Sequence, residues 1–323
     1  MTVQIDTPTL EKQLSNIFSR NETGNVIVSI LSRAEYDYRS TFPIEIVTCL
    51  INHHKKLILF CKYLDGICRK EDGHRGGIEY EIKVYQTILR QNELTTVRYY
   101  GSSFIQSYNE TVIVLEYLEN SERLHETMEP EVFLSQAAKW IAGLHSQSIT
   151  ERFAFLHRYS KDYFNSWIYQ IEAIQDLVRN SHPWLLKLIN FFKRNIHFLT
   201  KVDQCLIHGE FYANNILVFN NGIYPIDWET TAIGPGEIDL ASLIEGWSED
   251  LATKMINAYK IERWGSTWAA PQSFDRTMIM SQLYLQFSQF SSGWLQCPNH
   301  LEVLYSIATK LSFHGKKEPK NRS

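Results

Sequence analysis

The sequence has few cysteines, and none stands in a pair suited to binding a metal. The five are Cys49, Cys61, Cys68, Cys205 and Cys297, and no two of them are spaced as Cys-x-x-Cys. Structural zinc sites need such pairs, and disulfide frameworks need even, regularly spaced sets. We therefore expect neither a zinc site nor a disulfide-stabilised scaffold.

Long apolar runs and a strong charge of one sign are also absent. No run reaches the roughly 18–20 residues needed to cross a bilayer, and the first residues lack the basic and apolar regions of a secretory signal. A net charge of −4 over 323 residues gives no electrostatic reason to propose nucleic acid or an anionic membrane as a partner. We expect a cytoplasmic protein that binds neither.

Segments rich in β-branched and aromatic residues dominate the first third of the chain. Polar segments with turn character separate them, and an amphipathic helix precedes them at residues 7–18. Residues 82–89 carry apolar side chains at helical spacing. The expected strands are 26–31, 44–50, 56–63, 96–102 and 111–117. This order predicts a small antiparallel sheet with one inserted helix.

The remainder of the chain is mainly helical by the same criterion. The expected helices begin at Pro130 and continue with 163–178, 184–199, 238–247, 250–259, 274–291 and 301–311. A polar segment at 119–123 separates this part from the sheet. We predict an α+β fold with two lobes, in which residues 1–118 form the sheet-rich lobe and 119–313 the helical lobe. Residues 314–323 form a charged tail.

One β-hairpin interrupts the helical part, and polar residues flank it. Two apolar runs surround an Asn-Asn-Gly turn. A turn centred on Asn221 pairs Asn215 with Asp227, so an amide oxygen and a carboxylate meet at one end of the hairpin. Glu210 lies five residues upstream of Asn215. Oxygen ligands of this kind suit a magnesium ion that carries phosphates, with a carboxylate nearby to accept a proton.

Two motifs carry a resemblance to a known family. The first is His208-Gly209-Glu210-Phe211-Tyr212-Ala213-Asn214-Asn215, and the second is Ile226-Asp227-Trp228-Glu229, followed by Gly234-Pro235-Gly236-Glu237-Ile238-Asp239-Leu240-Ala241. From about Gly24 to Leu311 the chain resembles the aminoglycoside phosphotransferase and choline kinase branch of the protein-kinase-like fold. The resemblance implies transfer of the γ-phosphate of ATP, with Mg²⁺, to a hydroxyl of a small molecule. Aminoglycosides, amino alcohols and sugars are acceptor classes of this kind.

The resemblance also implies roles for residues in both lobes. Asn215 and Asp227 would hold magnesium. Lys62 would contact the α- and β-phosphates and pair with a glutamate of the inserted helix. Glu81 fits that partner by its spacing, and Glu79 is the competitor on a different helical face. The backbone of Glu116 and Leu118 would bind adenine.

Glu210 departs from the family signature, which has aspartate at this position. The extra methylene moves the carboxylate by about 1 Å, a displacement large enough to affect the rate. Three interpretations stay open: Glu210 is the base in a site reshaped around it, it is a poor base, or the protein binds nucleotide without catalysis. The last predicts a scaffold, and the absence of glycine from the loop at 32–41 favours it as well.

Several of these residues also have simpler interpretations. His208 is typical of a buried, hydrogen-bonded loop residue, and Asp239 of one that fixes the loop or caps a helix. Lys62 is compatible with a strand lysine that extends to solvent. Glu229 lies near the expected metal or is solvated or salt-bridged. A glycoside hydrolase that uses Glu210 and Glu229 is a third function, but it leaves Lys62 without a purpose.

Overall fold

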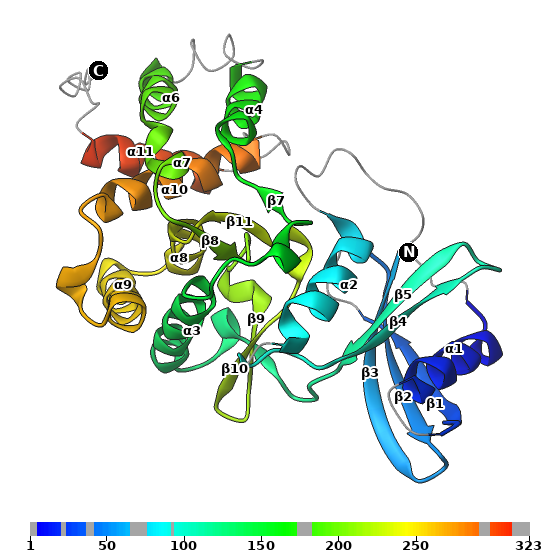
Figure 1. The fold of residues 1–323 in the computed structure, drawn as a ribbon. Helices are drawn as coiled ribbons and strands as arrows, with labels where there is room; N and C mark the ends of the chain where they lie inside the picture. The colour runs from blue at the N-terminus through cyan, green and yellow to red at the C-terminus, as the bar shows by residue number, and fades with distance from the viewer. Residues whose placement is uncertain are drawn as a thin grey trace, which may run out of the picture. The chain divides into compact units, whose positions relative to one another are not determined.

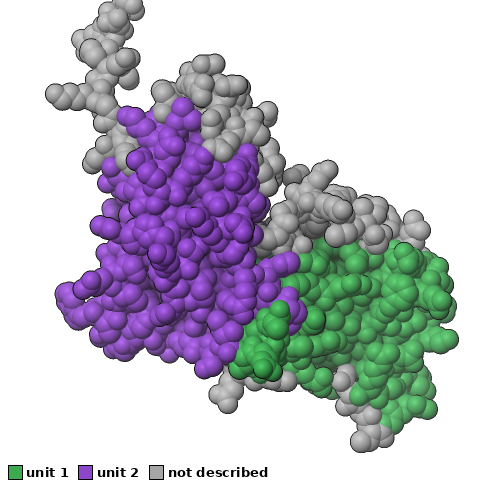
Figure 2. Space-filling view, turned by 45° about the horizontal axis from the view of Figure 1, so that its top comes forward, with its two compact units in different colours: residues 1–136, 150–154, 213–231 green, residues 137–149, 155–212, 232–323 purple. Residues whose placement is uncertain are grey.

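The structure is a computed structural model that describes residues 5–20, 24–36, 42–64, 76–91, 94–172, 183–290 and 298–311. It divides into two compact units (Figure 2). Unit 1 comprises residues 1–136, 150–154 and 213–231, and unit 2 comprises residues 137–149, 155–212 and 232–323. Unit 1 thus contains residues 119–136 and the hairpin in addition to the predicted first lobe. Where the functional domains divide stays a prediction.

A five-stranded antiparallel sheet with the order β1-β2-β3-β5-β4 forms most of unit 1 (Figure 1). The strands are β1 (Val28–Glu35), β2 (Ile44–Ile51), β3 (Lys55–Leu64), β4 (Tyr99–Ile105) and β5 (Glu110–Glu116). The helix α2 (Gly77–Thr87) and a short 3-10 turn (Leu89–Gln91) connect β3 to β4. The predicted order of three strands, helix and two strands is confirmed, although β4 begins three residues later than expected.

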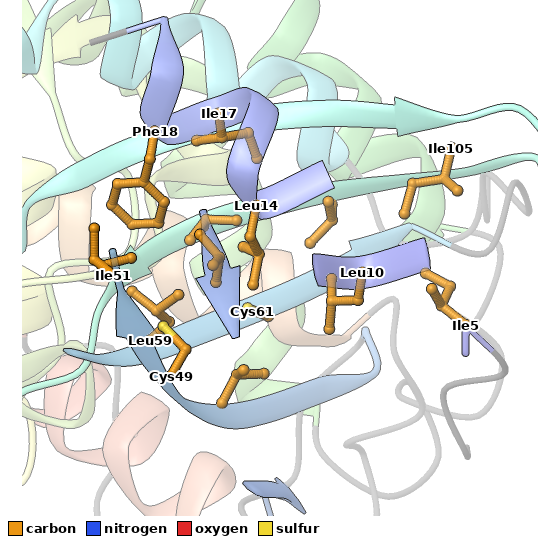
Figure 3. Close-up of a cluster of buried hydrophobic side chains, with 14 of the residues drawn as sticks. Ile5, Leu10, Leu14, Ile17, Phe18, Cys49, Ile51, Leu59, Cys61 and Ile105 are labelled. Atoms are coloured by element: carbon orange, nitrogen blue, oxygen red, sulfur yellow. The ribbon is translucent and has the colours of Figure 1, made fainter. Parts of the chain in front are cut away.

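The helix α1 (Thr7–Ser19) packs its apolar face against this sheet (Figure 3). Its buried residues are Leu10, Leu14, Ile17 and Phe18. On the sheet side, β2 alternates strictly between buried and half-buried positions, as a strand with one face in a core must. Asp6 caps the helix, because its carboxylate accepts the N–H of Thr9 at 2.8 Å. This core fixes the position of β3 through its buried residues Leu59, Cys61 and Tyr63. It therefore also fixes the position of Lys62, which lies on the same strand.

The predicted hairpin is present, but its register differs by one residue from the expected one. β9 (Ile216–Phe219) pairs with β10 (Gly222–Pro225), and β9 also pairs with β6 (Glu122–Arg123). The two turn residues are Asn220 and Asn221, with φ angles of 47° and 61°. A two-residue turn with two positive φ angles matches the twist of the strands. Centring the turn on Asn221 alone is therefore wrong, and Ile216 pairs with Pro225.

Unit 2 combines a small sheet with the helices. The sheet has the order β7-β11-β8, with β7 (His157–Arg158), β11 (Ala232–Pro235) and β8 (Gln204–Ile207). Strands of two to four residues show no clear alternation, so the sequence did not predict them. The helix α3 (Pro130–His145) begins in unit 1 and ends in unit 2. The other helices are α4 (Lys161–Glu172), α6 (Pro183–Asn195), α7 (His197–Thr200), α8 (Glu237–Ile244), α9 (Glu249–Trp264), α10 (Phe274–Phe290) and α11 (Pro298–Lys310).

These helices confirm the expected helical character of the second half. The segment expected as one helix at 184–199 is divided into α6 and α7. Residues 173–178 of another expected helix and the charged tail at 314–323 lie outside the described residues. Among the described residues, no helix combines the length and the apolar character needed to cross a membrane. The structure thus has the mixed α+β composition that the sequence predicts.

Candidate functional site

Lys62 lies on β3, on the side of the strand that faces α2 in unit 1. Its side chain is buried, with 5% of the residue exposed. Its Nζ is 2.8 Å from a carboxylate oxygen of Glu81 and 3.1 Å from one of Asp227. Glu79 is exposed. The expected pairing of Lys62 with Glu81 is therefore present, and a strand lysine that extends to solvent is excluded.

The charges around Lys62 explain why a buried ammonium is tolerated. Burial by itself lowers the pKa of Lys62, but the carboxylates of Asp227 and Glu81 outweigh it and raise the pKa above its ordinary value. Burial raises the pKa of Glu81, against the opposing effect of Lys62. Glu229 adds a third carboxyl group that acts on the same ammonium. Three carboxyl groups around one ammonium leave a site that favours additional positive charge.

The backbone of Asp227 departs from the strand that precedes it. Its φ and ψ are 66° and 68°, in the left-handed region that few residues other than glycine adopt. The N–H of Ile226 donates to the carbonyl of Asn215 at 2.9 Å. Asn215 therefore lies opposite Ile226, and the expected strand pairing of Asn215 with Asp227 is wrong. The left-handed backbone conformation, and not strand alternation, sets the direction of the Asp227 side chain.

Asn215 and Asp227 nevertheless line the same pocket of unit 1. No group of three or more His, Cys, Asp or Glu side chains in the described part of the chain is arranged to hold a metal. The two candidate ligands, Asn215 and Asp227, supply one amide oxygen and one carboxylate. Mg²⁺ is commonly held by one or two protein oxygens and completed by phosphate oxygens and water. The donor set therefore fits a magnesium ion that arrives with a nucleotide, and it does not fit a metal held by protein alone.

The pocket has a volume of about 410 Å³, within the ordinary range for small-molecule sites. Lys62, Glu81 and the two candidate metal ligands belong to its polar lining. The apolar lining comes from both the sheet and the hairpin: Ile44, Phe60, Val97, Leu115, Leu118, Leu217 and Ile226. An apolar slot next to a charged end is suited to a flat ring that carries an anionic group.

The two expected base-binding residues, Glu116 and Leu118, also line this pocket. The N–H of Glu116 donates to the carbonyl of Arg98 at 2.8 Å, so only its carbonyl remains as a group for a base. The carbonyl of Leu118 accepts the N–H of Ser121 at 3.1 Å. The N–H of Leu118 has no hydrogen-bond partner in the part of the chain that the structure describes. One acceptor and one donor are the groups that an adenine edge requires.

Three further charged residues line the pocket, and only Glu229 was singled out from the sequence. Arg123 and Glu126 line the pocket from a segment that the sequence marks only as a polar connector. The guanidinium of Arg123 donates to the carbonyl of Asn214. Glu229 also lines the pocket and is buried, which excludes its solvated interpretation. The second motif contained the signal for Glu229, whereas Arg123 and Glu126 had none.

Glu210 lies in unit 2, directly after β8 and the residues His208 and Gly209. The N–H groups of His208 and Gly209 donate to the two carboxylate oxygens of Asp239, at 2.7 and 2.8 Å. Asp239 is fully buried on α8 and fixes this loop. Gly209 has a φ of 92°, which a residue with a side chain rarely adopts.

The same loop is supported from α3. Nε2 of His145 is 3.0 Å from Asp239, and its Nδ1 is 2.8 Å from the hydroxyl of Tyr259. Burial lowers the pKa of His145, although the hydrogen bond to Asp239 opposes this. Glu210 and the candidate metal ligands belong to different units, so their convergence stays a prediction.

Comparisons with known proteins identify the family. A model of the phosphotransferase enzyme family matches residues 67–274, more than half of the chain. No curated protein is similar enough in sequence to match the chain. Solved structures are similar in fold at low identity.

Three of these structures illustrate the range. A putative aminoglycoside phosphotransferase from Ralstonia eutropha has a TM-score of 0.66 and 12% identity, with 95% of this chain and 96% of that chain covered. Choline kinase LicA from Streptococcus pneumoniae has a TM-score of 0.55 and 13% identity, with 95% and 93% covered. Spectinomycin phosphotransferase in complex with ADP and spectinomycin has a TM-score of 0.58 and 12% identity, with 97% and 96% covered. The chain has a protein-kinase-like fold and belongs to the phosphotransferase enzyme family.

Proposed function

We propose that the protein transfers the γ-phosphate of ATP, with Mg²⁺, to a hydroxyl of a small molecule that is aminoglycoside-, amino alcohol- or sugar-like. The observation that carries the proposal is the buried Lys62, held between Glu81 and Asp227 at the polar end of the pocket. A lysine held in this way presents a fixed positive charge to nucleotide phosphates. The similar spectinomycin phosphotransferase was solved with ADP and its acceptor, which supports nucleotide use.

The residues of unit 1 divide into three tasks. The apolar lining and the backbone of Glu116 and Leu118 bind the base. Lys62 grips the phosphates, and Glu81 orders it. Asn215 and Asp227 hold Mg²⁺, which neutralises charge on the transferring phosphoryl group when it is bound.

Glu210 has the remaining task in this proposal. The acceptor hydroxyl oxygen attacks the γ-phosphorus, and its proton goes to the carboxylate of Glu210. The bond between the γ-phosphorus and the bridging oxygen breaks, and that oxygen leaves with ADP. Because phosphoryl transfer depends mainly on positioning and charge neutralisation, a glutamate in place of aspartate is compatible with turnover.

ADP release measured over a panel of hydroxyl acceptors tests the proposal. The panel contains aminoglycosides, amino alcohols and sugars, each with ATP and with or without Mg²⁺. We expect acceptor-dependent, Mg²⁺-dependent release with at least one class, and loss of release in Lys62→Met. Binding of Mg²⁺ and ATP without turnover of any acceptor would contradict it.

One observation favours a second candidate function, a nucleotide-binding scaffold. Glu210 stands where the family signature has aspartate, so the departure falls on the residue expected to accept the proton. A scaffold predicts thermal stabilisation by ATP and Mg²⁺, no ADP release, and an unchanged biological function in Glu210→Gln. The family membership leaves the glycoside hydrolase hypothesis without support.

A further inference from the structure

The sequence contains a glycine pair, Gly76 and Gly77, that the proposed reaction does not use. Gly77 has a φ of 72°, so its backbone requires glycine. Gly76 has an ordinary φ of −81° and needs glycine for another reason. A Cβ on Gly76 would lie 2.2 to 2.5 Å from atoms of Tyr80, closer than real contacts allow. Gly76 therefore makes room for the side chain of Tyr80, one turn further along α2.

Tyr80 and Gly76 both bind the backbone that follows the candidate metal ligand Asp227. The hydroxyl of Tyr80 donates to the carbonyl of Thr231 at 2.6 Å. The N–H of Gly76 donates to the carbonyl of Glu229 at 2.9 Å. All of these residues belong to unit 1. We call these two bonds the α2 latch.

The donors and the acceptors of the α2 latch are both close in sequence to charged residues of the pocket. On α2, Tyr80 precedes Glu81, whose carboxylate holds Lys62 at 2.8 Å. On the other segment, Glu229 and Thr231 are two and four residues from Asp227. The N–H of Trp228 approaches the second oxygen of Glu81 at 3.4 Å. A shift of α2 along the 227–231 segment would therefore change the distance from Lys62 to both of its carboxylates.

We propose that Tyr80 is a positioning residue, which sets the geometry of Lys62, Glu81 and Asp227 through the α2 latch. The expected effect of Tyr80 on nucleotide binding and catalysis rests on the proposed function. The two hydrogen bonds of the α2 latch do not depend on it. The Tyr80 side chain reaches the loop because Gly76 lacks a Cβ, so the glycine and the tyrosine act together. Neither residue needs to touch the nucleotide.

The test compares Tyr80→Phe with Tyr108→Phe as a matched control. Tyr108, in the β4–β5 turn of the same unit, donates an equally short hydrogen bond of 2.6 Å, to Asp6. Each variant loses one hydroxyl and the short hydrogen bond that this hydroxyl donates. Tyr108→Phe also loses a longer bond of 3.3 Å that the Tyr108 hydroxyl accepts from the N–H of Asp6, so it is the more demanding control. We expect Tyr80→Phe to weaken binding of ADP with Mg²⁺ by about fivefold, the effect of one neutral hydrogen bond. Tyr108→Phe should bind as the wild type does.

A double-mutant cycle separates positioning from a general structural role. In a Glu81→Gln background, Tyr80→Phe should weaken binding by less than about twofold, because its effect passes through Glu81. An equal, fivefold effect in both backgrounds would overturn the proposal. Gly76→Ala offers a second route to the same loss, because its Cβ displaces the Tyr80 side chain.

Amide hydrogen exchange tests, without a measurement of activity, whether the α2 latch holds the two segments together. In Tyr80→Phe, exchange should rise relative to the wild type in both peptides that cover 76–87 and 227–235. In Tyr108→Phe, exchange of these two peptides should match the wild type. Unchanged exchange in the 227–235 peptide would overturn the latch. If the wild type binds no nucleotide but exchange rises as expected, the proposed function fails and the latch stands.

Discussion

Nζ of Lys62 lies 3.1 Å from a carboxylate oxygen of Asp227, which is 165 residues further along the chain. The contact joins the sheet to the segment that leaves the hairpin, and both belong to unit 1. The pocket that these two residues line is therefore formed within one folded unit, although its residues come from two distant parts of the chain.

Loss of the Lys62 ammonium should destabilise the fold as well as abolish nucleotide binding. In Lys62→Met, Glu81 keeps only 1% of its surface exposed and loses its counter-charge. Breaking a buried pair from one side costs about 3–5 kcal/mol. We expect a decrease of about 3 kcal/mol in the free energy of unfolding, measured with urea.

The double variant Lys62→Met/Glu81→Gln provides the control for this prediction. Because it removes the uncompensated carboxylate, it should recover part of the lost stability. A double variant that is less stable than Lys62→Met would contradict the assignment of the loss to the buried charge.

Asp227→Asn should remove the Mg²⁺ dependence of nucleotide binding. The amide keeps the size of the side chain but lacks the charge that attracts a divalent cation. We expect ADP release to fall by at least about a hundredfold. Isothermal titration with ADP should show that Mg²⁺ no longer improves the affinity. An unchanged Mg²⁺ effect would place the metal on other ligands.

Substitution of Glu210 separates catalysis from binding. Glu210→Gln should reduce kcat by about 10²–10⁴-fold, because a general base contributes on this scale. Nucleotide affinity should stay within about twofold, because the proposed contact of Glu210 is to the acceptor hydroxyl and not to the nucleotide. Glu210→Asp restores the residue of the family signature and keeps the charge, so it should retain more activity than Glu210→Gln. Equal activity of all three proteins would show that Glu210 is not the base.

The stability of the fold should depend on the ionisation of His145. Burial lowers its pKa below the ordinary value of 6.5, so folding disfavours the protonated imidazole. Its contribution to stability is present above 6.5 and decreases as the pH falls through the lower, folded-state pKa. Arg263 adds to the shift, and Asp239 opposes it.

The measurement is the free energy of unfolding from pH 7.5 to 5, for the wild type and for His145→Gln. The wild type should lose stability faster with falling pH, because glutamine does not titrate. Parallel curves would show that the pKa of His145 is not lowered in the folded protein. The difference in slope, and not the absolute stability, is the result that counts.

Local patterns predicted much of the fold and part of the site. The β-branched content of the segment that forms β2 and the apolar spacing in α1 are local properties, and both elements formed where those patterns lie. Glu81 was preferred over Glu79 because its spacing to the apolar residues of the helix is similar to that of the family, and the structure pairs it with Lys62. The strands of two to four residues in unit 2 were missed, because such short segments have no period to detect.

The hairpin register shows why an otherwise correct pattern misplaced a side chain. The sequence Asn-Asn-Gly indicates a turn. A two-residue turn at Asn220 and Asn221 and a turn centred on Asn221 alone lead to strand pairings that differ by one residue. That difference reverses the face of every side chain in a strand. Asp227 still faces the pocket because it leaves the strand with a left-handed backbone. No sequence pattern predicts a left-handed backbone conformation at this aspartate.

The sequence by itself determined which residue types the protein has for the proposed phosphoryl transfer, and their order: a lysine on a strand, a glutamate on a helix, and two motifs with candidate oxygen ligands. Those features follow from local spacing and from charge. Only the tertiary structure decided that Lys62 also contacts Asp227, that Glu229 is buried beside them, and that the hydroxyl of Tyr80 binds the segment after Asp227. The contacts of Lys62 with Asp227 and of Tyr80 with Thr231 join residues 165 and 151 positions apart along the chain. They form only when the sheet and the hairpin segment lie in one folded unit.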